Sequence, residues 1–419
     1  MAIMISLLLA AISMAPPEGV IPDVTIYEDV QVWEDGGFSQ RNLIVSGGRI
    51  LSSVPEGAAV TRVALEGRDI VPAMANAHTH LTNASEEQSW AYLKEGVYYA
   101  WNPNLIQIPD WHAFMARPDT YEVKTSWGGM TEPGGHPEKL YTVNLREWVY
   151  TDRAEDSFLG DAFHYGRTEE EIVAALDLLT AQNADFVKML LVFSEDYAER
   201  RNDPAYYGSK ALNPENVPFL VAEAKKRGLP SYFHVESNFD LGVAARAGAQ
   251  FAGHLPGYAS GNRLADYAIT LPTLSAMQAA DMAAVPTYAL ARYGYDAAEE
   301  AGTLDPAARD AHYAVQAANL RLLQDGGVAL LTGTDAAFHV RDELGHWVAI
   351  GGVTMAEGLE AAFTTARRLF PERRIQCFYA GCEADFLVLT QNPLEGVEAL
   401  SAIELRIKGG ALVEARADD

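Results

Sequence analysis

Eight apolar, strand-like segments alternate with amphipathic helical segments through the middle of the chain. The strand candidates are residues 70–78, 96–101, 121–127, 185–193, 231–235, 250–254, 282–288 and 328–334, and helices are expected at 169–184, 214–227 and 306–324. Strand–helix alternation with eight strands predicts an α/β fold, the (β/α)8 TIM barrel. Around the third strand, residues 102–163 are rich in Trp, Tyr, Pro and Gly with little periodicity, and we interpret them as long loops.

The two ends of the chain share a different pattern of short strands and glycine turns. Strands are expected at 24–33, 42–46 and 49–54, and again at 385–390, 403–408 and 411–415, with Gly47-Gly48 and Gly409-Gly410 as turns. Both ends therefore predict one small β-sandwich domain. It would comprise residues 21–69 and 376–419, and residues 70–375 would form the barrel.

Residues 1–15 form an apolar run that ends in Ser13-Met14-Ala15, a small-x-small pattern typical of signal-peptide cleavage. We therefore expect a leader over residues 1–20 and a periplasmic or secreted protein. Against this, the first basic residue is Arg41, so a positive n-region is missing. A mis-assigned start or a buried N-terminal segment, with a cytoplasmic protein, is the alternative. No later apolar stretch reaches the roughly 20 residues of a membrane span, so stable membrane insertion is not expected.

The charge balance excludes some partners. The 419 residues contain 31 Lys and Arg against 57 Asp and Glu, a net charge of −26, so a nucleic-acid partner is not expected. The two cysteines, Cys377 and Cys382, are compatible with one local disulfide or with two free thiols. We expect a small-molecule substrate, and the sequence leaves open association into a homo-oligomer.

A pair of histidines ends the first predicted barrel strand. His78 and His80 are two residues apart, so an extended backbone would place both imidazoles on one face, where they could bind a metal ion. Two hydrogen-bonded histidines without a metal are the alternative.

Polar residues on later strands strengthen the metal hypothesis. Lys188 interrupts an apolar strand, His234 and His254 end two more strands, and Asp335 follows the eighth. Each has a simpler explanation: the histidines could bond backbone groups, Asp335 could cap a helix, and Lys188 could extend to solvent. Catalytic groups of a barrel gather at the C-terminal ends of its strands, so together these residues predict a shared site.

The order His-x-His, Lys, His, His, Asp resembles the amidohydrolase superfamily. The resemblance covers about residues 45–410, including the stretches 351–355, 381–389 and 392–394. Within the superfamily the chain looks similar to the imidazolonepropionase-like and Xaa-Pro or Xaa-Arg dipeptidase-like branch, including Pro133-Gly134-Gly135-His136 near the third strand.

The resemblance implies two divalent metal ions, expected to be Zn²⁺, bridged by Lys188 as N6-carboxylysine. His78, His80 and Asp335 would bind one ion, and His234 and His254 the other. A bridging hydroxide activated by the metals would be the nucleophile, and Asp335 would transfer its proton to the leaving amine. His136, Tyr288 at the end of the seventh strand, and Glu236 are candidate substrate contacts. The alternative for His136 is a loop histidine without a role, and for Glu236 a surface or salt-bridged position.

Two positions depart from related patterns. Asn76 stands where the family often has Asp, and Glu236 follows His234 by two residues, whereas deaminases of the superfamily carry a Glu three residues after this His. The expected function is zinc-dependent hydrolysis of a C–N bond in a dipeptide or an N-acyl amino acid. Hydrolysis of a cyclic amide or a lactone is the alternative reaction, and a non-catalytic metal-containing binding protein is the alternative of another class.

Overall fold

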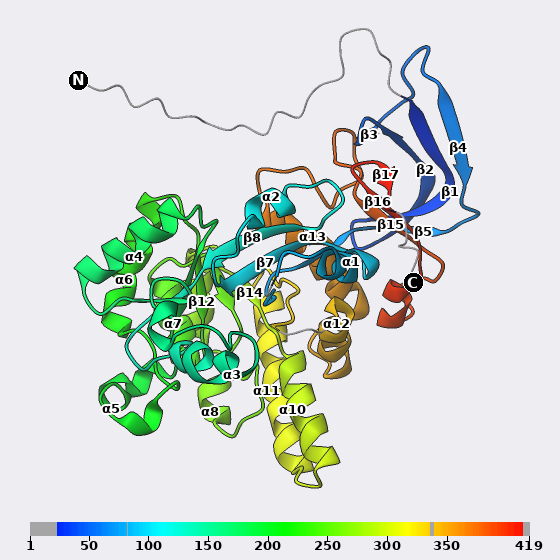
Figure 1. Cartoon of the computed structure of the whole chain (residues 1–419). Coiled ribbons are helices and arrows are strands. Elements are labelled where there is room, and N and C mark those ends of the chain that lie inside the picture. Colours follow the sequence, from blue (N-terminus) through cyan, green and yellow to red (C-terminus); the bar gives the residue numbers. More distant parts are fainter. Residues whose placement is uncertain (1–22, 82, 336–338, 414–419) are drawn as a thin grey trace, which may run out of the picture.

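The computed structural model describes residues 23–81, 83–335 and 339–413 (Figure 1). The expected leader, residues 1–20, lies outside the described residues. Strands from both ends of the chain lie together at one end of the molecule, drawn in blue and red in Figure 1, and the helices of the middle of the chain lie beside them. Among the described residues, no helix is long and apolar enough to cross a membrane.

One mixed sheet joins the two chain ends. Its order is β17-β16-β15-β5-β1-β2-β3, and β4 also pairs with β1. We expected a β-sandwich here. The described strands instead form one hydrogen-bonded sheet, because β1 pairs with β2 along one edge and with β4 and β5 along the other. The bounds are β1 (Val24–Glu34), β2 (Gly37–Ser46), β3 (Arg49–Leu51), β4 (Val60–Ala64), β5 (Asp69–Pro72), β15 (Phe386–Leu389), β16 (Ile403–Lys408) and β17 (Ala411–Leu412).

Two parallel sheets form the middle of the chain. One has the order β6-β7-β8 and the other β10-β9-β11-β12-β13-β14. Their strands are mostly buried, which is why they read as apolar runs. The bounds are β6 (Met74–Asn76), β7 (Val97–Leu105), β8 (Glu122–Trp127), β9 (Gly129–Thr131), β10 (Phe163–Tyr165), β11 (Val187–Leu190), β12 (Ser231–His234), β13 (Phe251–Gly253) and β14 (Ala283–Val285).

Hydrogen bonds connect the two parallel sheets at both margins. The Asp185 amide donates to the Thr125 carbonyl over 2.9 Å, which links the start of β11 to β8. At the other margin, residues 328–332 lie between β14 and β6: the Leu331 amide donates to Ala284 over 2.8 Å, and the Ala77 amide donates to Thr332 over 2.7 Å. The strand expected at 328–334 is reduced to one isolated bridge, between Leu330 and Ala284.

The expected strand 70–78 is divided between two sheets. β5 pairs with β15 of the end sheet, whereas β6 pairs with β7, and Ala73 between them donates its amide to the Asp385 carbonyl. An unbroken apolar run cannot reveal this transfer, because both halves are buried.

Helices flank the parallel sheets, and several begin at residues suited to the role. Thr168 accepts a hydrogen bond from the Glu171 amide at the start of α4, and Asp305 caps α11 just before Pro306. The helices are α1 (Glu86–Lys94), α2 (Trp111–Met115), α3 (Arg146–Trp148), α4 (Glu169–Ala181), α5 (Tyr197–Arg200), α6 (Val217–Lys226), α7 (Asn238–Arg246), α8 (Leu264–Tyr267), α9 (Leu271–Ala279), α10 (Ala289–Glu300), α11 (Pro306–Asp325), α12 (Val340–Ala349) and α13 (Met355–Leu369).

The region expected to be long loops is more ordered than its composition suggested. Residues 102–163 contain the end of β7, α2, β8, β9, α3 and the short helical segments η1 (Leu140–Leu145) and η2 (Glu155–Phe158). The expectation of long loops was therefore wrong for much of this region. Other short helical segments are η3 (Ser194–Asp196), η4 (Pro204–Tyr206), η5 (Pro214–Asn216) and η6 (Val397–Ser401).

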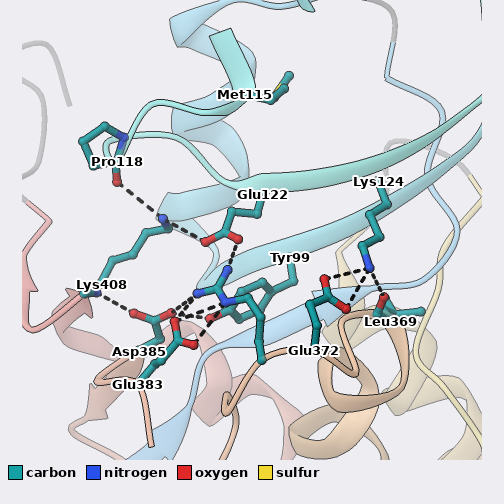
Figure 2. Close-up of polar contacts among 12 residues, drawn as sticks. Tyr99, Met115, Pro118, Glu122, Lys124, Leu369, Glu372, Glu383, Asp385 and Lys408 are labelled. Atoms are coloured by element: carbon teal, nitrogen blue, oxygen red, sulfur yellow. Dashed lines mark hydrogen bonds and ion pairs between the residues drawn. The ribbon is translucent and has the colours of Figure 1, made fainter. Parts of the chain in front are cut away.

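An ionic network holds the end sheet against the parallel sheets (Figure 2). Arg373 bonds to both Glu122, at the start of β8, and Glu383, just before β15. Lys408, at the end of β16, lies 3.3 Å from Glu122, and the Tyr99 hydroxyl on β7 donates to Asp385. Charges of both signs alternate here, so each carboxylate has a cation or a donor beside it.

We expect Arg373→Ala to lower the free energy of unfolding by on the order of 3 kcal/mol, because Glu122 and Glu383 lose their shared cation in a mostly buried site. Urea denaturation would measure the change. Arg309→Ala is the matched control. It removes an exposed pair with Asp310 and should leave the free energy of unfolding almost unchanged. Equal effects of the two substitutions would contradict a structural role for the network.

Candidate metal centre

The structure brings six sequence-predicted residues to one end of the parallel strands. His78 and His80 follow β6, Lys188 lies on β11, His234 ends β12, His254 follows β13, and Asp335 follows the segment 328–334. The histidine pair lies just past its strand rather than within it, so the expected placement on one extended strand was wrong. The two rings nevertheless converge. Their Nε2 atoms are 3.3 Å apart, and each lies 2.9 Å from Oδ1 of Asp335.

The spacing of these three donor atoms fits a metal ion. A tetrahedral zinc ion with ligands at about 2.0–2.1 Å holds its ligand atoms about 3.3–3.4 Å apart, close to the spacing seen here. Donor atoms of His78, His80 and Asp335 all lie within 4.8 Å of one another. Two imidazoles and a carboxylate are also a ligand set that Zn²⁺ accepts. The assignment of these residues as ligands stays a prediction.

The other three residues surround the same point. Nε2 of His254 is 3.9 Å from Oδ2 of Asp335, and the His254 ring lies 4.4 Å from His78 and 4.7 Å from His234 between centroids. Lys188 is only 3% exposed, and its Nζ lies 4.8 Å from the centre of the Tyr232 ring. Burial lowers the pKa of Lys188 to about 7, so a substantial part of its amine is uncharged near neutral pH.

Burial also keeps two of the histidines neutral. It lowers the pKa of both His78 and His234 to about 3. Neutral imidazoles have a free lone pair at one ring nitrogen, which a metal ion requires.

Hydrogen bonds orient two of the rings from behind. Nδ1 of His78 lies 2.8 Å from the Tyr232 hydroxyl, and Nδ1 of His254 lies 2.8 Å from Oγ1 of Thr287. Each contact occupies Nδ1 and leaves Nε2 directed toward the cluster. Tyr232 packs so closely on Gly253 that a Cβ at this glycine would lie 1.7 Å from the Tyr232 ring, so only glycine fits at the end of β13.

Asn76, which departs from the family pattern, connects the backbone around two candidate ligands. Its Oδ1 accepts hydrogen bonds from the amides of His78 and Thr334, over 3.1 and 3.2 Å, and its Nδ2 donates to Oγ1 of Thr334 over 2.9 Å. The amide thus satisfies donors and an acceptor at once, which a carboxylate could not do.

Strained backbone occurs at the same place. His254, Thr287 and Asp335 have φ angles of +119°, +53° and +59°, a region that residues other than glycine adopt rarely. Such conformations cost free energy and tend to occur where the fold positions functional groups.

Glu236 lies at the cluster rather than on the surface. Its Oε1 is 3.0 Å from Nε2 of His234 and accepts a hydrogen bond from the Tyr258 hydroxyl over 3.0 Å. Burial raises the pKa of Glu236 to about 7. Its backbone amide donates to the buried carboxylate of Asp240, which therefore positions this segment.

Of the candidate substrate contacts His136 and Tyr288, only His136 lies at the cavity. His136 lies beside His234, with ring centroids 5.0 Å apart, and lines the cavity at the cluster. Tyr288 does not reach it: its hydroxyl donates to the Pro256 carbonyl and accepts from Asn319. The proposed contact by Tyr288 is therefore wrong. The strand before it ends at Val285, and the side chain directed toward His254 is Thr287.

Two tyrosines of the site were missed in the sequence. Tyr232 precedes His234 by two residues on one strand, so the two-residue period could have placed it on the same face. Tyr258 stacks on His254 at 4.0 Å between ring centroids, but it belongs to a loop without periodicity, and no sequence signal identified it.

A cavity of about 320 Å³ opens at the cluster. Its lining includes the candidate ligands His80, Lys188, His234, His254 and Asp335, together with apolar side chains from the region between β7 and β10. A second cavity, of about 410 Å³, lies on the other side of His80 and is lined by Thr79, Glu95 and His339 among others. The first cavity is large enough for a small organic substrate.

Comparison with known proteins identifies the fold. No protein-family model matches the sequence, and no curated protein matches it. Among solved structures, A. niger ochratoxinase aligns with a TM-score of 0.71 and 18% identity over 94% of this chain and 96% of its own. A Xaa-Pro dipeptidase with bound methionine gives 0.68 and 16% over 94% and 100%, and an amidohydrolase gives 0.68 and 17% over 93% and 98%. At identities of 16–18%, these likenesses show that the chain shares the fold of these proteins.

We expect Tyr232→Phe to weaken zinc binding about 10- to 100-fold, because the His78 ring loses the hydroxyl that orients it. Competition with a chromophoric chelator would measure the affinity. Tyr206→Phe removes a hydroxyl that bonds to Glu199 at the surface and should leave the affinity unchanged. An unchanged affinity in Tyr232→Phe would show that the ring is held by packing alone.

Proposed function

We propose that this chain is a metal-dependent hydrolase that cleaves a C–N bond of a small substrate. The observation that carries the proposal is the convergence of His78, His80 and Asp335 at donor spacings of 2.9–3.3 Å, in a cluster of which His80 and Asp335 line a cavity. The amidohydrolase and the Xaa-Pro dipeptidase that share the fold bear names of enzymes that hydrolyse amide or peptide bonds. Dipeptides and N-acyl amino acids are the first substrates to consider.

We propose further that the parallel strands close into a (β/α)8 barrel. β6, β7, β8 with β9, β11, β12, β13 and β14 would be its first seven strands, and residues 328–332 would be the eighth. Support comes from the hydrogen bonds that Leu331 makes with Ala284 and Ala77 makes with Thr332, on either side of this segment. Barrel residues 70–375 and the end domain, 21–69 with 376–419, remain the proposed division of the chain. Closure would explain why six distant residues meet at one end.

We propose that the remaining donors hold a second metal ion. His234 and His254 would bind it, and Lys188 would bridge the two ions as N6-carboxylysine. Carboxylation needs a neutral amine, and burial of Lys188 favours that form. Bound Zn²⁺ would lower the pKa of a coordinated water and polarise the scissile carbonyl.

The protein's own groups would then handle the proton and the substrate. Asp335, which bonds to both His78 and His80, would take a proton from water and pass it to the leaving amine. His136, beside His234, and Tyr258, stacked on His254, would contact the substrate. Hydrolysis adds OH from water to the carbonyl carbon and H to the amine nitrogen.

Lys188→Ala should reduce bound zinc from about two ions to one or fewer per chain. We expect kcat/KM to fall at least about a hundredfold, because metals supply several kcal/mol of transition-state stabilisation. Elemental analysis and a hydrolysis screen over dipeptides, N-acyl amino acids and lactones would measure both. Lys225→Ala, at an exposed position of α6, is the control. Full zinc content with undiminished hydrolysis in Lys188→Ala would refute the bridging role, and a zinc-loaded protein without activity on any amide or ester would favour a binding protein.

We also propose that the protein is exported to the periplasm or secreted. Support comes from the disulfide between Cys377 and Cys382, since such bonds persist in oxidising compartments. Cell fractionation with thiol labelling should find the mature protein outside the cytoplasm with both cysteines blocked. Reduced, labelled cysteines in a cytoplasmic fraction would contradict the proposal.

A further inference from the structure

The walls of the cavity differ sharply in chemistry. One side carries the candidate ligands, and another carries Leu105, Leu140, Tyr141, Leu145 and Tyr150. Leu140 and Leu145 belong to η1, and Tyr150 follows α3 directly. The cavity therefore combines a polar reacting end with an apolar surface wide enough for a ring or a branched chain.

The apolar wall is fixed in place. Asn104 donates to the Tyr141 hydroxyl over 2.8 Å, and this hydroxyl donates to the Asn104 carbonyl over 3.1 Å. Leu145 and Tyr150 pack against a small apolar cluster that contains Tyr141, Phe158 and Phe163, separate from the main core. The wall is thus a built surface of the fold rather than a set of loose side chains.

Cations are scarce around this cavity. Among the described residues that line it, Lys188 is the only lysine, and none is an arginine. Lys188 belongs to the candidate metal cluster. Asp335 and the nearby Glu236 add acceptors, and the whole chain has a net charge of −26. A free carboxylate on the part of the substrate against the apolar wall would lose its hydration without gaining a cationic partner among the described lining residues, which is unfavourable.

We infer that the amine or acyl group of the substrate amide is bulky and apolar, such as an aryl group, and that this group bears no carboxylate. This inference rests on the proposed hydrolase function. The bond broken is the C–N bond of the amide, and water supplies the OH and the H.

A matched pair of anilides tests the inference. N-(4-methylphenyl)acetamide and 4-acetamidobenzoate differ by a methyl or a carboxylate at one ring position. We expect the zinc-loaded full-length protein to hydrolyse the neutral anilide with a kcat/KM about a hundredfold higher. Calorimetric binding of 4-methylaniline and 4-aminobenzoate, the two amine products, should show the same preference without relying on catalysis.

Leu145→Arg should lower the ratio of kcat/KM for the neutral anilide to kcat/KM for the carboxylated anilide about tenfold or more, because it provides a cation at the apolar wall. Leu140→Arg places the same charge at a neighbouring wall position, should Leu145→Arg fail to fold. Trp148→Arg is the matched control: this side chain is 83% exposed on α3, outside the cavity lining, and the substitution should leave the preference unchanged.

The outcomes separate the two proposals. Hydrolysis that favours the carboxylated anilide, or equal binding of both amines, would overturn the inference and leave the hydrolase intact. If the protein binds 4-methylaniline more tightly than 4-aminobenzoate but hydrolyses neither anilide, the result would support the inferred selectivity of the cavity and contradict the proposed hydrolase function.

Discussion

The contact between the first and last segments of the parallel strands is the constraint on which the candidate site depends. Asp335 reaches His78 and His80 only because residues 328–334 lie beside β6. Three links hold them there: Ala77 bonds to Thr332, Asn76 bonds to Thr334, and the amides of Thr334 and Asp335 both donate to the His78 carbonyl. Gly333 is part of this contact, since a Cβ there would lie 3.0 Å from the His78 amide and 2.3 Å from Val285. A larger residue would separate the donors.

Most of the candidate site could be predicted from the sequence for one physical reason. Burying a polar residue within or at the end of an apolar strand costs free energy unless it has a partner. Parallel strands bring their ends to one edge, where such residues can contact one another. Lys188, His234 and His254 followed this rule. The rule locates a residue by its strand end, so it fails where the strand end is misplaced. β14 ends at Val285, and consequently Thr287 rather than Tyr288 faces His254.

Other features depend on partners far along the chain. The division of residues 70–78 at Ala73 follows from pairing with β15, more than 300 residues later, and local periodicity contains no trace of it. Tyr258 and the apolar wall around Tyr141 belong to segments whose side chains are ordered by tertiary contacts rather than by a repeating pattern. The two cysteines were similarly undecided, because their pairing depends on how residues 377–382 turn. Strand pairing, cysteine pairing and the shape of the cavity therefore could not be predicted from this single sequence.

The position of Ala73 connects the end sheet with the metal centre. Its amide bonds to the Asp385 carbonyl, while the Asp385 side chain accepts from Tyr99 on β7, the strand that pairs with β6. Asp385 thus bonds both to Ala73, directly before β6, and to β7, which pairs with β6. Asn76 is the last residue of β6, and His78 follows two residues later. The Asp385 carboxylate belongs to the network of Figure 2, and a guanidinium nitrogen of Arg373 lies 3.9 Å from it. The end sheet therefore helps to hold β6, the strand that directly precedes the first two candidate ligands.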